Sequence, residues 1–254
     1  MEIRIEGIGH SYGDLTALED ISLTVREGEI LALVGPSGCG KSTLLNIVGG
    51  LLEPSSGRVL LGGVAPNDCL NPLTYVFQDF ALLPWRTVAG NVALGLEHHG
   101  LNRREQSVRV ADVLARTNLE EFADLYPKQL SGGMQQRLGI ARALAVRPAV
   151  LLLDEPLSAL DAQTRDLLME DFESRWMKER TTAVYVTHNL NEAIRLADKI
   201  ALLSRRPGTL REIVDVSAPR GTRLGEAHTV QLQEYLWKLI RQEAAVADRE
   251  VSHV

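Results

Sequence analysis

Cysteine is scarce in this sequence, since the 254 residues contain only Cys39 and Cys69. The two do not form a C-x-x-C pair, so a zinc site is not expected, and two cysteines cannot supply a disulfide framework. A reducing compartment is the simplest environment for such a chain.

Long apolar runs and an excess of positive charge are also absent. No segment approaches the ~18 apolar residues needed to cross a bilayer, and the N-terminal residues lack the apolar stretch of a signal peptide. We therefore expect a soluble chain that meets a membrane only through partners. The net charge of −6 gives no overall attraction to nucleic acid, and no nucleic-acid partner is expected.

The composition is that of a globular α/β protein, with 45% hydrophobic and 24% charged residues. Strands are predicted at Ile3–Ile5, Ile21–Val25 and Ile30–Val34, and later at Val150–Leu153 and Thr182–Val186. Further expected elements are strands at 59–61, 74–77, 200–203 and 210–216, and helices at 42–49, 103–118, 131–145, 162–178, 191–197 and 229–245. We predict one domain over residues 1–220, a helical subdomain at about 88–145, and a helical tail over 221–254.

A glycine-rich segment follows the buried strand at Ile30–Val34 and precedes a helix. It matches G-x-x-x-x-G-K-[ST], in the strand-to-helix context that this phosphate-binding motif requires. Glycines allow the backbone to turn its N–H groups toward phosphate oxygens, the lysine supplies a positive charge, and the serine hydroxyl can bind Mg²⁺. The predicted ATP-binding residues are Gly35, Pro36, Ser37, Gly38, Cys39, Gly40, Lys41, Ser42 and Thr43.

Two acids end a second buried strand. Val150–Leu153 is aliphatic and is followed by Asp154 and Glu155, at the sheet edge where open α/β folds bind ligands. Asp154 is predicted to hold Mg²⁺. Glu155 is predicted to act as a general base, or to orient the water that attacks the γ-phosphate.

A third motif opens a later helix. Ser131 is a suitable N-cap, and Gly132 and Gly133 expose backbone N–H groups at the helix start, which makes a second anion site. Two glycines in a first turn cost about 1 kcal/mol each relative to alanine. A plain capped helix does not explain them.

Together these motifs resemble the ATP-binding subunits of ABC transporters, over about Ile3 to Val216. The resemblance implies an α/β P-loop ATPase of the ABC type, with a mixed sheet core, an N-terminal antiparallel β part and a helical subdomain. It also implies the roles of further residues. These are Gln78 as a Mg²⁺ and water contact, His188 as a γ-phosphate contact, Tyr12 as an adenine stack, and Ser131, Gly132, Gly133, Gln135 and Asp161 as contacts to ATP across a dimer. Tyr12 could instead simply pack on the sheet.

The same resemblance implies partners. Two copies would sandwich ATP head to tail, and separate transmembrane permease subunits and an external solute-binding protein would complete an importer. The chain would then lie on the cytoplasmic side of the inner membrane. The segment Leu82–Val88, Asn91-Val92 and Arg206-Pro207-Gly208 resemble the nitrate, sulfonate and taurine importer group. The solute itself is not encoded here.

Two other classes remain open. One is an ABC ATPase that acts on nucleic acid or ribosomes, although the segment between Lys41 and Ser131 lacks sustained heptads. The other is a P-loop kinase for a small molecule, which would not need Ser131–Gly133.

Overall fold

The computed structural model describes residues 1–158, 160, 162–163, 165–166, 169–170, 181–216 and 227–251. They form two compact units, one of Met1–Gly63 with Thr182–Val254 and one of Val64–Thr181. Asp161 and most of the helix predicted over 162–178 lie outside the described residues.

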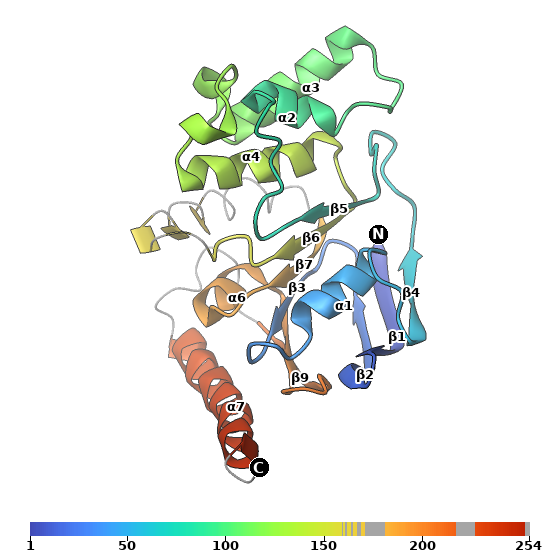
Figure 1. The fold of residues 1–254 in the computed structure, drawn as a ribbon, viewed down its shortest axis with the longest axis vertical. Helices are drawn as coiled ribbons and strands as arrows, with labels where there is room; N and C mark the ends of the chain where they lie inside the picture. The colour runs from blue at the N-terminus through green and yellow to red at the C-terminus, as the bar shows by residue number, and fades with distance from the viewer. Residues whose placement is uncertain are drawn as a thin grey trace. The chain divides into compact units, whose positions relative to one another are not determined.

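The first unit contains a three-stranded antiparallel sheet in the order β2-β1-β4 (Figure 1). Its strands are β1 (Glu2–Tyr12), β2 (Leu15–Val25) and β4 (Ser56–Gly62). The strands predicted at Ile3–Ile5 and Ile21–Val25 are confirmed, but β1 and β2 are much longer. The register of β1 against β2 shifts between Ile5 and Ser11. Such bulges break the period-2 pattern, so the sequence marks only part of each strand.

The first unit also contains strands in the order β7-β3-β8-β9, where β3 pairs in parallel with β7 and β8, and β9 is antiparallel. The strands are β3 (Ile30–Val34), β7 (Thr182–Val186), β8 (Lys199–Leu203) and β9 (Leu210–Asp215). Every residue of β3 and β7 is buried, as their continuous apolar sequences predict. Because β3, β7 and β8 are parallel, the loops that follow them leave from the same edge.

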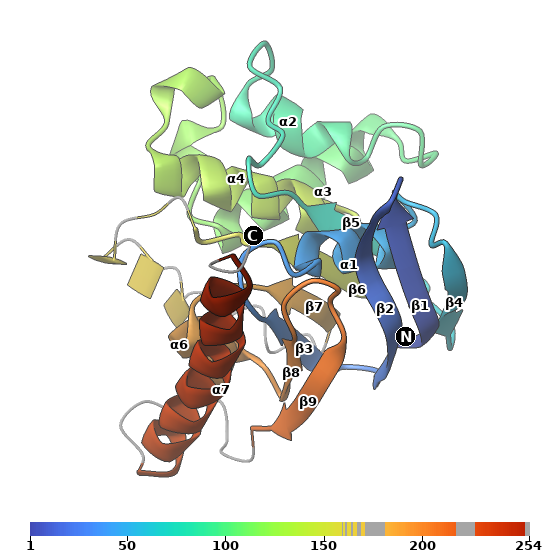
Figure 2. The ribbon, with the colours of Figure 1, turned by 60° about the horizontal axis from the view of Figure 1, so that its bottom comes forward.

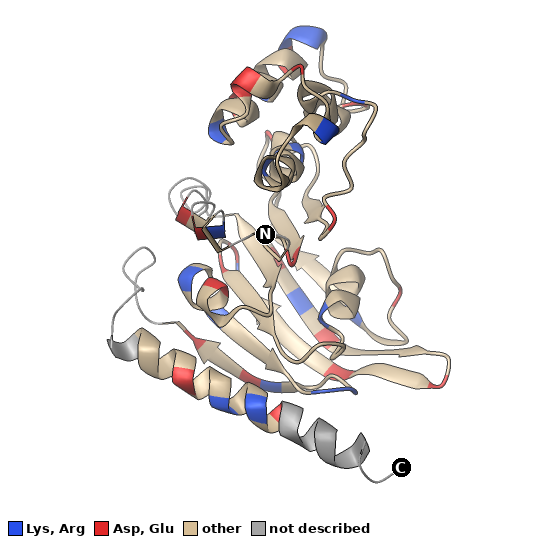
Figure 3. Ribbon diagram, turned by 60° about the vertical axis from the view of Figure 1, so that its left-hand side comes forward, with Lys and Arg blue, Asp and Glu red and all other residues tan. Residues whose placement is uncertain are grey.

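The helices of this unit are α1 (Lys41–Val48), α6 (Leu190–Leu196) and α7 (Ala227–Val251). α7 runs beside the β8–β9 hairpin (Figure 2), where Tyr235 donates to Glu212 of β9 at 2.9 Å. It buries Leu232 and Leu236 and carries charged residues of both signs (Figure 3). The predicted tail helix is therefore confirmed, and it is longer than expected.

The second unit combines a parallel strand pair, β5 (Leu73–Val76) and β6 (Val150–Asp154), with helices. The helices are α2 (Val88–Leu94), α3 (Arg103–Arg116) and α4 (Gly132–Ala145), with 3₁₀ turns at Glu120–Phe122 and Pro127–Gln129. Side-chain caps define their starts: Thr87 accepts from Gly90, Asn102 forms a capping box with Glu105, and Ser131 accepts from Met134. The helices expected at 103–118 and 131–145 are confirmed to within two residues.

No helix among the described residues is long and apolar enough to span a bilayer.

Candidate functional site

The phosphate loop Gly35–Ser42 joins β3 to α1, and either a steric clash or a left-handed backbone conformation disfavours replacement of its glycines. Gly38 and Gly40 have φ of 74° and 100°, in the left-handed region that favours glycine. A Cβ on Gly35 would lie 2.8 Å from the Leu203 carbonyl oxygen, and one on Gly40 would lie 2.6 Å from Leu18 Cδ2. Because α1 starts directly after Gly40, with no acid in its first turn, its N–H groups suit an anion.

The Lys41 side chain folds back into this loop. Its Nζ donates to the carbonyl oxygens of Gly35 and Pro36, each at 2.9 Å, and the residue is only 7% exposed. The Cys39 thiol lies 3.8 Å from the same Nζ. Burial raises the pKa of that thiol, and the Lys41 charge partly opposes the shift. The loop therefore holds a positive charge where the motif predicts phosphate.

Tyr12 ends β1 beside the first turn of α1. Its hydroxyl lies 3.5 Å from Thr43 Oγ1, and its ring is in edge contact with His10. Tyr12 is 51% exposed, so about half of its surface is available to a ligand. An exposed aromatic ring next to the phosphate loop suits a nucleobase, and the stacking role stays a prediction.

His188 follows β7, which pairs with β3. The Thr187 N–H donates to the Leu33 carbonyl oxygen at 3.3 Å, so the His188 loop and the phosphate loop leave neighbouring strand ends. Glu192, buried in α6, accepts from the hydroxyls of Thr187 at 2.7 Å and Tyr185 at 2.9 Å. These contacts fix the backbone on both sides of an exposed His188.

In the second unit, Asp154 ends β6 next to the end of β5. The Tyr75 hydroxyl donates to Asp154 Oδ2 at 3.3 Å. Burial and the Asp154 charge raise the pKa of Tyr75 well above its usual value, so this hydroxyl stays a donor. Glu155 follows with φ 45°, a conformation that costs non-glycine residues of order 1–3 kcal/mol and is concentrated at functional sites.

The same edge gathers the other predicted residues of this unit. Gln78 Nε2 lies 3.5 Å from Ser158 Oγ, which donates to the Glu155 carbonyl oxygen at 3.0 Å. Ser158 thus links the Gln78 side chain to the backbone of Glu155, the residue after Asp154.

The Ser131–Gly133 segment starts α4 as predicted. Ser131 Oγ accepts from the Met134 N–H at 3.3 Å, and Gly132 faces open space. Gln135 is engaged locally, since its Nε2 donates to the carbonyl oxygens of Pro127 and Leu130 at 3.0 and 3.3 Å. Its contact with a second subunit's nucleotide stays a prediction.

Sequence reasoning missed several residues that hold the site. Tyr75 and Glu192 act on Asp154 and on the His188 loop, and Gln136 donates from α4 to the Pro156 carbonyl oxygen beyond Glu155. Gln136 could have been found, because it lies at helical spacing from the buried Ile140 and Leu144. Tyr75 carries no such signal, since its partner depends on the pairing of β5 with β6.

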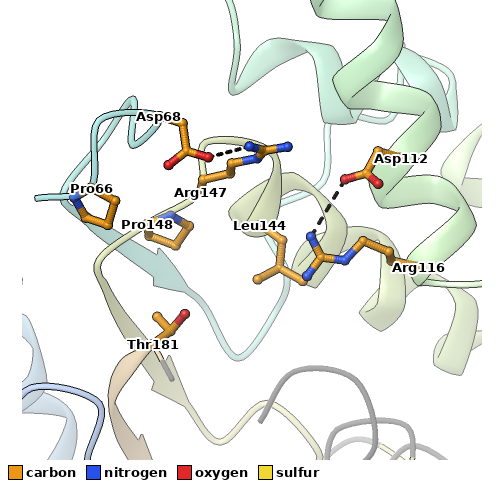
Figure 4. A pocket seen from close by; sticks show the side chains of 8 residues that line it. All are labelled: Pro66, Asp68, Asp112, Arg116, Leu144, Arg147, Pro148 and Thr181. Atoms are coloured by element: carbon orange, nitrogen blue, oxygen red, sulfur yellow. Dashed lines mark hydrogen bonds and ion pairs between the residues drawn. The ribbon is translucent and has the colours of Figure 1, made fainter. Parts of the chain in front are cut away.

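A separate cavity of about 490 Å³ lies in the second unit (Figure 4). Asp68 pairs with Arg147, whose hydrogen bond lowers the pKa of Asp68, and Asp112 lies 3.7 Å from Arg116. The remaining lining residues are Pro66, Leu144, Pro148 and Thr181. None of the predicted site residues lines this cavity, and it is not the candidate site.

Comparison with known proteins agrees with this geometry. The ABC transporter family model matches residues 18–158. The chain is 44% identical over 211 residues to the nitrate import ATP-binding protein of Synechococcus elongatus, covering 82% of this chain and 32% of that protein. It is 40% identical over 231 residues to the taurine import ATP-binding protein of Rhizobium johnstonii, covering 91% of this chain and 88% of the relative.

Among solved structures, the chain resembles a dimeric ATP-binding cassette in a post-hydrolysis state, bound to ADP and phosphate. The TM-score is 0.73 at 33% identity, over 85% of this chain and 100% of that chain.

Proposed function

This chain belongs to the ABC transporter family as an ATP-binding, ATP-hydrolysing subunit, and from that premise we propose that it powers import of a small solute of the nitrate, sulfonate or taurine kind. One observation supports ATP binding and hydrolysis most directly. The Lys41 ammonium lies 2.9 Å from two carbonyl oxygens of a glycine-rich loop at the start of a helix. ATP phosphates would replace those carbonyls as its partners.

The residue roles follow from the chemistry of each group. Backbone N–H groups and Lys41 bind the phosphates, and Tyr12 stacks on adenine. Glu155 acts as general base or orients the attacking water, and Gln78 and His188 contact the water and the γ-phosphate.

Mg²⁺ is the proposed cofactor. The half-buried Asp154 carboxylate and the exposed Ser42 hydroxyl are oxygen donors of the kind that Mg²⁺ prefers. Few protein ligands are needed, because Mg²⁺ keeps several waters and takes substrate phosphates. When bound, the ion would neutralise charge on the β- and γ-phosphates.

A second copy is the proposed partner for Ser131, Gly132 and Gly133. These residues present N–H groups at the start of α4, while Gly35–Ser42 already provides a phosphate loop in the same chain. The similar solved cassette is dimeric. Asp161 is proposed to contribute to the same interface.

Separate permease subunits are the proposed membrane partners, with an external binding protein that delivers the solute. The segment after Gln78 includes Trp85, a residue that is 71% exposed, and an exposed aromatic anchor suits a protein interface. The chain would then work on the cytoplasmic side of the inner membrane.

The test combines hydrolysis with transport. γ-Labelled ATP incubated with the purified chain should release labelled inorganic phosphate, whereas a kinase would label an acceptor. Proteoliposomes that contain the chain with its co-purified permeases should take up labelled nitrate or taurine only when ATP is enclosed on the side of this chain. ATP hydrolysis without uptake of any nitrogen or sulfonate solute would contradict the importer assignment.

A further inference from the structure

The turn between β8 and β9, residues Ser204–Thr209, packs directly on the phosphate loop. Arg206 donates to the Gly38 carbonyl oxygen through Nε at 3.3 Å and through Nη2 at 3.1 Å. Two donors of one guanidinium therefore hold one carbonyl in the middle of the loop, and charge-assisted hydrogen bonds of this kind are stronger than neutral ones.

The same turn fits the loop without spare room. A Cβ on Gly208 would lie 2.1 Å from the Cys39 carbonyl oxygen. Gly208 also bonds to the β2 backbone, donating to the Ala17 carbonyl oxygen at 2.9 Å and accepting from the Glu19 N–H at 3.0 Å. Gly208 therefore fixes the distance between the turn and the loop.

Ser204 keeps the turn in this shape. Its buried hydroxyl donates to the carbonyl oxygen of Arg205 or Pro207, at 2.9 and 3.0 Å, and accepts from the Thr209 N–H at 2.8 Å. A turn closed by one central hydroxyl presents Arg206 in a defined direction.

The helix α7 reaches this turn through Glu243. Its carboxylate accepts from the Arg205 N–H at 3.2 Å and pairs with Arg211 Nε of β9 at 2.9 Å. Contacts thus run from α7 to the turn, and from the turn to Gly38.

We propose that Arg206 is a positioning residue for nucleotide binding, and that α7 adjusts it through Glu243. A glycine-rich loop has many accessible conformations, and ordering it opposes ligand binding. Arg206 restrains the Gly38 peptide through its carbonyl oxygen, so the arginine itself occupies no N–H group of the loop. This inference rests on the ATP-binding role of the loop and assigns a function to the Arg206–Gly208 turn and to the C-terminal helix.

The test measures MgADP affinity by isothermal titration, which needs no turnover. Arg206→Gln should raise the Kd about tenfold, the size expected for loss of hydrogen bonds from a charged donor. Arg206→Lys keeps the positive charge but loses the two-donor guanidinium, so its Kd should lie between those of Arg206→Gln and the wild type. Arg58→Gln is the matched control, because Arg58 is an exposed arginine that pairs with Glu6 at 2.8 Å, away from the loop.

Two further measurements separate positioning from folding. Arg206→Gln should raise the KM for ATP with kcat within about twofold, and amide hydrogen exchange in residues 35–43 should become faster while the Tm without nucleotide stays within a few degrees. Glu243→Ala should raise the Kd about two- to threefold, because it removes the contact between α7 and the turn that carries Arg206.

An unchanged Kd in Arg206→Gln would overturn the positioning role and leave the ATPase assignment intact. An unchanged Kd in Glu243→Ala would overturn the part played by α7. A wild-type chain that failed to bind ADP would instead overturn the ATP-binding role and this inference with it.

Discussion

The Tyr75 hydroxyl donates to Asp154 across 3.3 Å, from the strand next to the one that the acid ends. β5 and β6 pair in parallel, with Tyr75 opposite Leu152 and Val76 opposite Leu153. A tyrosine thus orients the carboxylate that the sequence assigns to Mg²⁺. Partners of this kind fix the direction of a metal ligand and are functionally important even without touching the metal.

Tyr75→Phe should raise the Mg²⁺ concentration needed for half-maximal ATPase by about tenfold. Phenylalanine keeps the ring, which stacks on Phe77 with centroids 4.4 Å apart, so the fold should be retained. The measurement is ATPase rate against free Mg²⁺ at saturating ATP. Tyr235→Phe is the control, because it removes a hydroxyl that donates to Glu212 at the surface. Identical Mg²⁺ curves for Tyr75→Phe and the wild type would remove Tyr75 from the metal site.

Lys41→Ala should weaken MgADP and MgATP binding by about 10- to 100-fold, the range for losing a charged donor to phosphate. The Lys41 ammonium is held inside the phosphate loop by two carbonyl oxygens. Alanine therefore removes a positive charge from the phosphate-binding site itself. Titration calorimetry measures the loss, with the exposed Lys238→Ala of α7 as control. Undiminished affinity would show that phosphate does not bind here.

Glu155→Gln should bind ATP normally and lose turnover by at least about 100-fold, as expected when a general base is removed. Glutamine preserves the shape and one acceptor oxygen but cannot take a proton. Because ATP would persist, the variant should form an ATP-dependent dimer, measured by size-exclusion chromatography with light scattering. Glu121→Gln, an exposed acid of the same unit, serves as the control. Normal steady-state ATPase in Glu155→Gln would take the catalytic role away from this residue.

Much of the site could be predicted from local sequence, because a phosphate loop depends on glycines, a lysine and a strand-to-helix junction that are contiguous in the chain. Asp154 was predicted because it follows the aliphatic residues Val150–Leu153, whereas the family resemblance supplied His188, which lies two residues after β7. Contacts such as Tyr75 with Asp154, or Arg206 with Gly38, join residues that are 79 and 168 positions apart. Only strand pairing and turn packing create such contacts, and no periodicity encodes them.

The limits of pattern reading are clearest in β1 and at Gln135. Register shifts in β1 interrupt the alternation, so the strand seemed to end long before Tyr12. The resemblance predicts a nucleotide contact for Gln135 across a dimer, and that stays a prediction, but the motif does not show that its amide donates to the carbonyl oxygens of Pro127 and Leu130 within the chain. A motif fixes which residue stands at a position, but neighbouring carbonyls decide where its side chain donates.

Thr187→Val should lower kcat about five- to tenfold and leave the KM for ATP within about twofold. Valine has nearly the same shape but cannot donate to Glu192 or accept from the Asn189 N–H, which lie 2.7 and 3.0 Å from the hydroxyl. Loss of one hydrogen-bond donor to the buried Glu192 carboxylate costs about 1–3 kcal/mol of folding free energy. We expect the backbone beside His188 to shift in response, because it is the nearest segment that can move. Because the substitution does not change the phosphate loop, the affinity for ATP should stay the same.

A double-mutant cycle with His188→Ala measures whether Thr187 acts through the histidine. If it does, Thr187→Val should cause no further loss of kcat once His188 is removed. Tyr185→Phe supplies the comparison, because it takes the other hydroxyl from Glu192 without altering the residues next to His188. Equal losses of kcat from Thr187→Val with and without His188 would mean that the Thr187–Glu192 contact supports folding alone. In that case Tyr185→Phe and Thr187→Val should lower the Tm by the same amount, because each removes one hydrogen-bond donor from the Glu192 carboxylate.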